Sequence, residues 1–119
     1  MKAKLKSYAI VFLSVLFFSI SQNASAFIRD GIINGRSGLS FSNVSYQFKT
    51  LNLTIKNRNK INVNFGGTMI FLDRHYREVA RAEILTKKIK RHSSRRFQGI
   101  FVKGSGNEAA SASHLVWEF

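Results

Sequence analysis

The segment LNLTIKNRNKINVNFGGTMIFL, residues 51–72, is the clearest indicator of fold class in this chain of 119 residues. Apolar and polar residues alternate on both sides of the polar run 57–60, and a period of two is typical of half-buried strands. The asparagines of this run favour a turn, because Asn bonds its own backbone and tolerates positive φ. Two strands are therefore predicted, with one set of inward side chains: Leu51, Leu53, Ile55, Ile61, Val63 and Phe65.

Two interruptions of this alternation predict irregular strand geometry. The glycine pair at 66–67 lies inside a strand pattern, which indicates a bulge or a close approach of another backbone. Upstream, the alternation in residues 39–48 changes phase between Phe41 and Val44, which predicts a bulge at 42–43.

Downstream of residue 72, further strands are predicted. Residues 79–85, VARAEIL, fit either a helix or a strand, and we favour a strand because strands flank the segment on both sides. Alternation continues in residues 94–103 and in 114–119. The chain contains no Pro or Cys. Six or seven short strands at regular spacing predict one all-β domain, either a β-sandwich or a small barrel, and we expect the sandwich.

The first 26 residues have the three regions of a secretory signal. A basic start is followed by an apolar run at 8–20 and by Ala24-Ser25-Ala26, a small-x-small cleavage pattern. The alternative is a membrane anchor, but the apolar run is shorter than the ~20 residues that a helix needs to span a bilayer. We predict cleavage after Ala26, export to the periplasm or beyond, and no transmembrane segment in the mature chain. Residues 27–38 then form a flexible lead-in, and 39–119 form the β-sandwich domain.

A resemblance to a known family supports the sandwich. Residues 68–84, TMIFLDRHYREVARAEI, resemble the middle of the small exported bacterial domains named for the pattern F-x-L-Y-D, and Asp73 is identical to the last residue of that pattern. Residues 53–63 and 92–101 resemble the segments that flank it, so that the resemblance covers roughly 51–102. It implies an immunoglobulin-like sandwich that serves as a binding or accessory module, without catalytic residues.

The chain is strongly basic, with 19 Lys and Arg against 6 Asp and Glu, and such a charge favours anionic partners. Half of the residues in 86–97 are basic, and Ile89 is expected to be their inward anchor. One interpretation is a solvated edge strand that charges protect from aggregation. The other is an anion-binding face that gains cations from the preceding turn. Its candidate residues are Lys87, Lys88, Lys90, Arg91, Arg95 and Arg96, with Arg74 and Arg77.

Other functions receive less support from the sequence. The acidic residues are dispersed and no nucleophile motif is present, so we expect neither an enzyme nor a cofactor. His75, His92 and His114 lack the spacing of a metal site. The sequence shows neither a recognition helix nor an aromatic platform, so we do not expect sequence-specific nucleic-acid binding.

The final residues HLVWEF are similar to the terminal strand of outer-membrane barrels. The chain is short for such a barrel, and we therefore interpret these residues as the last strand of a sandwich.

We therefore expect a non-enzymatic module that binds an anionic envelope or extracellular polymer through its basic face. The alternative is a structural or assembly protein that pairs with a protein partner through an exposed edge strand. A cationic effector that acts on membranes would need an amphipathic helix, which the sequence does not indicate.

Overall fold

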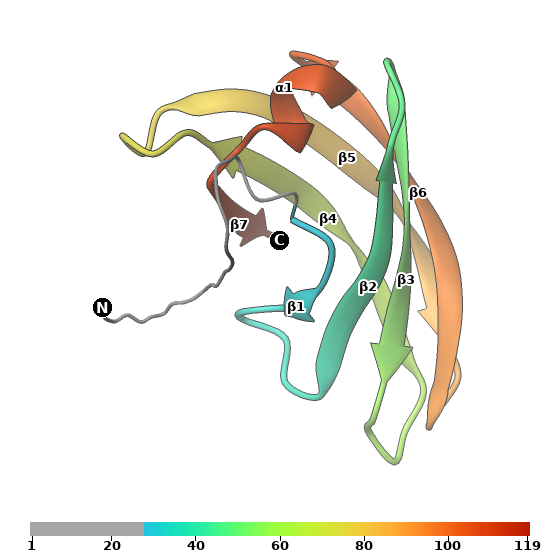
Figure 1. The fold of residues 1–119 in the computed structure, drawn as a ribbon. Coiled ribbons are helices and arrows are strands. Elements are labelled where there is room, and N and C mark those ends of the chain that lie inside the picture. Colours follow the sequence, from blue (N-terminus) through green and yellow to red (C-terminus); the bar gives the residue numbers. More distant parts are fainter. Residues whose placement is uncertain (1–27) are drawn as a thin grey trace.

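The computed structural model describes residues 28–119, so the predicted signal peptide and its cleavage point lie outside the described residues. The described chain is all-β, as predicted, and has one short helix near its end (Figure 1). Its elements are β1 (Gly31–Ile32), β2 (Leu39–Tyr46), β3 (Thr50–Asn57), β4 (Val63–Leu72), β5 (Glu78–Ile89), β6 (Ser93–Lys103), α1 (Gly106–Ala110) and β7 (His114–Glu118).

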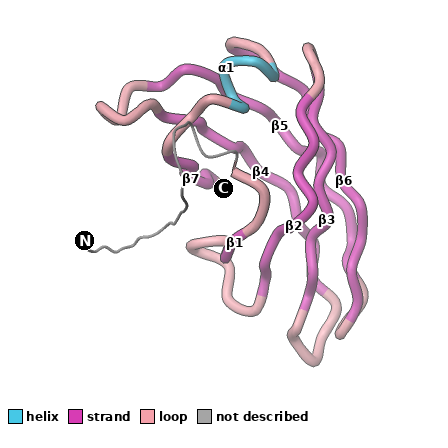
Figure 2. Tube along the Cα trace, in the orientation of Figure 1, coloured by secondary structure: helices cyan, strands magenta, loops and turns pink. Residues whose placement is uncertain are grey.

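The seven strands form one antiparallel sheet in the order β1-β2-β3-β6-β5-β4-β7. The sheet curls into a half-barrel (Figures 1 and 2). The expected immunoglobulin-like sandwich has two facing sheets, and the structure differs from it in this respect. The reason is that β6 pairs with β3 on one side and with β5 on the other, which joins all strands into a continuous layer.

Irregular pairing bends the central strands. The register between β4 and β5 shifts at Phe65/Gly67, as the glycine pair predicted. A Cβ atom on Gly66 would lie 2.4 Å from the Thr86 hydroxyl oxygen, so only glycine fits this close approach. The bulge predicted at 42–43 is also present, with Asn43 at a φ of 55°. Bulges add twist and bend strands, which is consistent with the strong curl of this sheet.

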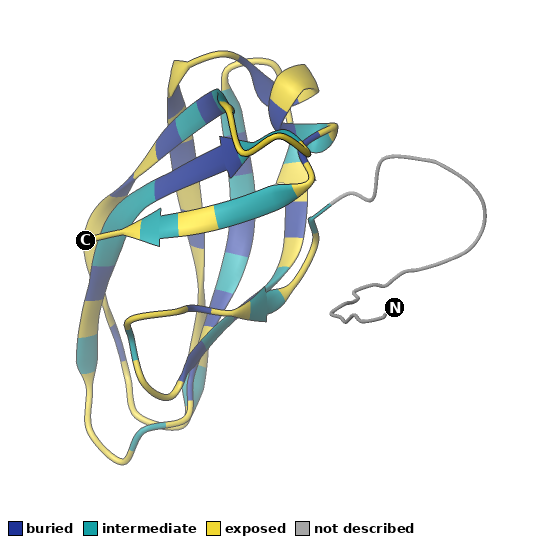
Figure 3. Ribbon diagram, turned by 90° about the vertical axis from the view of Figure 1, so that its left-hand side faces the viewer, coloured by how far each residue is buried: buried dark blue, intermediate teal, exposed yellow. Residues whose placement is uncertain are grey.

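Buried and exposed residues alternate along the strands, so that one face of the sheet carries the core (Figure 3). Aromatic side chains connect strands that are distant in the sheet. Phe41 of β2 lies 5.6 Å from Trp117 of β7, measured between ring centroids, and Tyr46 of β2 lies 5.9 Å from Phe71 of β4. The two ends of the sheet therefore meet through side chains rather than through a backbone ladder.

The described part of the expected lead-in packs against the domain. Gly31 and Ile32 pair with β2, and Ile33 is buried in the core. The segment 79–85 belongs to β5, which confirms the strand interpretation.

Candidate functional site

The connection between β3 and β4 crosses one end of the sheet. These consecutive strands are not paired, because β6 and β5 lie between them. The connecting loop 58–62 therefore reaches the turn 90–92 of the β5–β6 hairpin, where the His92 amide donates to the Asn59 carbonyl at 3.3 Å. On its other side the Arg58 amide donates to the Gly38 carbonyl at 2.9 Å. Three loops that are far apart in sequence thus form one end of the molecule (Figure 2).

Asn57 holds this end together. Its side chain is fully buried, and its Nδ2 lies 2.9 Å from the Ile61 carbonyl, 3.1 Å from that of Ile89 and 3.3 Å from that of Lys90. Its Oδ1 accepts from the Asn59 amide at 2.9 Å, which confirms the predicted asparagine turn. The hydrogen bonds from Asn57 to the carbonyls of Ile89 and Lys90 could not be predicted from the sequence, because the sequence pattern around Asn57 indicates only a local turn.

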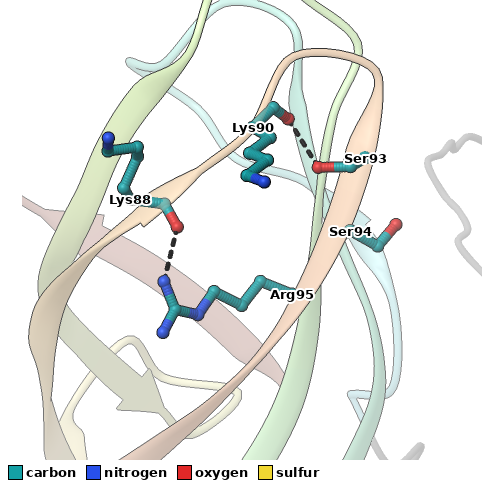
Figure 4. Close-up of a pocket in the computed structure, with 5 residues that line it drawn as sticks. All are labelled: Lys88, Lys90, Ser93, Ser94 and Arg95. Carbon is teal, nitrogen blue, oxygen red and sulfur yellow. Dashed lines mark hydrogen bonds between the residues drawn. The ribbon is translucent and has the colours of Figure 1, made fainter.

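Two adjoining depressions lie at this end. One, of about 390 Å³, is lined by Lys88, Lys90, Ser93, Ser94 and Arg95 (Figure 4). The other, of about 500 Å³, is lined by Lys60, Ile61, Asn62, Lys90 and Arg91. Lys90 belongs to both, and of the residues from 28 onward no acidic one lines either depression.

We call the five cations of the two depressions the basic end: Lys60, Lys88, Lys90, Arg91 and Arg95. Within residues 28–119, none of the five forms an ion pair. Four of them were candidates from the sequence. Lys60 was not, because only the crossing loop brings it beside Lys90.

The basic segment is not an edge of the sheet. β5 and β6 are internal strands in the sheet order, so the basic segment does not form an outer edge of the sheet. Ile89 is fully buried, as expected of the inward anchor. Direct pairing of β5 with β6 ends at Ile84 and Gly99, and beyond this point β5 pairs with β4 and β6 pairs with β3. The two strands approach again at their turn, where the Ser93 amide donates to the Lys90 carbonyl at 3.2 Å.

Lys87 and Arg96 lie outside the two depressions. The Lys87 ammonium sits 5.6 Å from the centroid of the Phe97 ring, which belongs to the buried side of β6. Arg96 pairs with Thr54 of β3 and faces away from Arg95, because successive strand residues point to opposite faces.

Arg74 and Arg77 lie at the opposite end of the sheet. They belong to the turn between β4 and β5, and the 12 residues of β5 separate this turn from the basic end. At ~3.3 Å per residue, that separation is roughly 40 Å along the strand. The expectation that these arginines add to the same end is therefore wrong.

Arg77 is moreover paired with an acidic side chain. Its Nε lies 3.0 Å from Asp73 Oδ2. The Arg77 amide, which also donates to Asp73, is the main cause that holds the pKa of this carboxyl below its ordinary value.

No protein-family model, curated protein or solved structure matches this chain. In the part of the chain from residue 28 onward, no helix has the length and apolar character needed to cross a membrane.

Proposed function

We propose that this protein is an exported, non-enzymatic binding module whose basic end engages an anionic polymer of the cell envelope or the extracellular space. The observation that carries the proposal is the grouping of five cations on two depressions that share Lys90 and that no acidic residue of the described chain lines. Cations gathered in concave surfaces focus the electrostatic field and raise the local concentration of anions.

The residue types suit phosphate or sulfate groups. The guanidinium groups of Arg91 and Arg95 can donate two parallel hydrogen bonds to one such group, and lysine adds a mobile point charge. Because the two depressions adjoin, successive charged groups of one polymer can occupy both of them. Several weak contacts on one chain then add to a useful affinity.

Export is the first part of the proposal that can be checked. Protein expressed from all 119 residues in a bacterial host is expected to begin at Phe27 after secretion, because residues 1–26 carry the signal pattern. Intact-mass measurement and N-terminal sequencing of the extracytoplasmic fraction test this. Recovery of the full 13.5 kDa chain from the cytoplasm alone would contradict it.

Binding to a polyanion is tested on a heparin column with the secreted protein. Changing the five cations of the basic end to Gln is expected to lower the NaCl concentration required for elution about twofold or more, because most counterion release is then lost. The wild-type protein is expected to be retained at physiological ionic strength and to elute only at higher salt.

A matched control separates the basic end from net charge. Five cations elsewhere are changed to Gln in one variant: Lys49, Lys56, Arg74, Arg96 and Lys103. Both variants have the same net charge, and circular dichroism confirms that each is folded. Equal retention of the two variants would show that charge alone acts, and the basic end would then not be a binding site.

The alternative function uses an edge strand. β7 pairs with β4 on one side, and no strand of the described residues pairs with its other side. Such an edge can accept a strand from a partner protein. Pairing of this kind depends on backbone hydrogen bonds and responds weakly to salt, so that a partner retained at high ionic strength would favour it.

A further inference from the structure

The depression beside Arg95 is an opening inside a β-hairpin. Continuing the register of Ile84 with Gly99 places Lys88 opposite Arg95, yet the backbones of these two residues are not paired. Instead, the Arg95 side chain crosses the opening, and its Nη1 donates to the Lys88 carbonyl at 2.8 Å (Figure 4). The two strands are thus separated between the Ile84–Gly99 pair and the turn, and one guanidinium group bridges the gap.

This bridge fixes the guanidinium group in place. One N–H bonds Lys88, and the remaining N–H groups have no hydrogen-bond partner among residues 28–119, so that they can donate to a ligand. At the turn, the Ser93 hydroxyl donates to the Lys90 carbonyl at 2.6 Å, which steadies the backbone from which Lys90 extends. The Lys90 side chain points from this turn into the opening, whereas that of Lys88 points away from it (Figure 4).

The opening therefore offers two cations to one small ligand. Its volume of about 390 Å³ is near the lower limit of typical small-molecule sites, which begin at ~300 Å³. The positive groups that face it are a fixed planar fork on Arg95 and a point charge on Lys90. A phosphate monoester carries about −1.5 to −2 at neutral pH, which matches two cations better than the single charge of a carboxylate or a sulfate ester does.

We infer that the opening between β5 and β6 is a discrete site for one phosphate monoester group carried by the anionic polymer. Arg95 binds two of its oxygens, and Lys90 balances the second charge. This inference rests on the proposed function and deepens it, because it names the chemical group that the basic end recognises.

The test is an NMR titration of the ¹⁵N-labelled secreted protein with glucose 6-phosphate, glucose 6-sulfate and inorganic phosphate as probes. The phosphate monoester is expected to shift the amides of residues 88–95 and to bind more tightly than the sulfate ester. Inorganic phosphate binding as tightly as the sugar phosphate would overturn the assignment to an esterified group.

A charge-preserving pair of variants locates the site. Arg95→Lys is expected to weaken binding of glucose 6-phosphate roughly tenfold, because it removes bidentate donation from a fixed fork. Arg96→Lys, one residue away on the opposite face, is expected to leave the affinity unchanged. Equal affinities of the two variants, or shifts spread evenly over all basic regions, would overturn the inference.

Arg95→Lys also removes the hydrogen bond from Arg95 to the Lys88 carbonyl, which could change the shape of the opening. A second pair of variants therefore leaves this hydrogen bond in place. Lys90→Gln is expected to weaken binding several-fold, whereas Lys103→Gln, at the other end of β6, is not. Heparin retention of the same proteins is read separately. If the wild-type protein binds heparin through the basic end but does not respond to glucose 6-phosphate, this inference alone is overturned. If the basic-end variant and its matched control are retained equally on heparin, the proposed function is overturned as well.

Discussion

Replacing Phe65 with alanine is expected to reduce the free energy of unfolding by about 3–5 kcal/mol, the usual cost of removing a large buried aromatic side chain. Phe65 is fully buried and lies at the junction of three parts of the core. Its ring centroid is 5.5 Å from that of Phe97, 5.6 Å from that of Trp117 and 5.8 Å from that of Phe119. The substitution therefore removes the contacts that link β4 to β6 and to the C-terminal residues.

Urea denaturation followed by tryptophan fluorescence measures this effect, because Trp117 contacts the Phe65 ring. Phe48→Ala is the matched control, since the Phe48 side chain is 63% exposed and the same change there is expected to cost below ~0.5 kcal/mol. Similar losses at both positions would contradict the placement of Phe65 at the centre of the core.

Replacing Asn57 with alanine is expected to cost about 2–4 kcal/mol, although the side chain is small. The reason is that a buried carbonyl, that of Ile89, loses its side-chain donor, and each unsatisfied buried group costs ~1–3 kcal/mol. The bonds to Ile61 and Lys90 are lost as well, which frees the loop 58–62 from the hairpin turn. Lys60 and Lys90 should then no longer be held together.

The same variant therefore has two readouts. Its unfolding midpoint in urea is expected to fall, and its elution from heparin is expected to shift to lower salt under conditions in which it is still folded. Asn52→Ala is the control, because Asn52 is in the same strand but is half-buried and its side chain has no hydrogen bond to any residue between 28 and 119. A stable Asn57→Ala protein with native amide shifts at Lys90 would show that the loops do not depend on this side chain.

The strands and their irregularities were predictable because they depend on local patterns. Alternation located β3, and the change of phase after Phe41 located the bulge at Asn43. The arrangement of the strands was not predictable in the same way. Alternation only separates an inward from an outward face, and a curled single sheet has the same inward face as a sandwich. The pairing of β6 with β3 depends on contacts between residues far apart in sequence.

The candidate site was predictable in part. The basic segment is visible as composition, but the sequence does not show that Lys60 joins it. One further distinction was available from the pattern. Phe97 and Phe101 point inward, so alternation already separates Arg95 from its neighbour Arg96.

The pairing of β6 with β3 also has a consequence for the newly made chain. β3 ends at Asn57 and its partner begins at Ser93, so that one edge of β3 has no partner until roughly forty more residues are synthesised. At ~5–20 residues per second, this interval lasts about 2–8 s. During that time Leu51, Leu53 and Ile55 form an alternating apolar strand with an open edge, which is the kind of segment that aggregates. A chaperone that delays folding until β6 has emerged would therefore be most useful to this protein between residues 57 and 103.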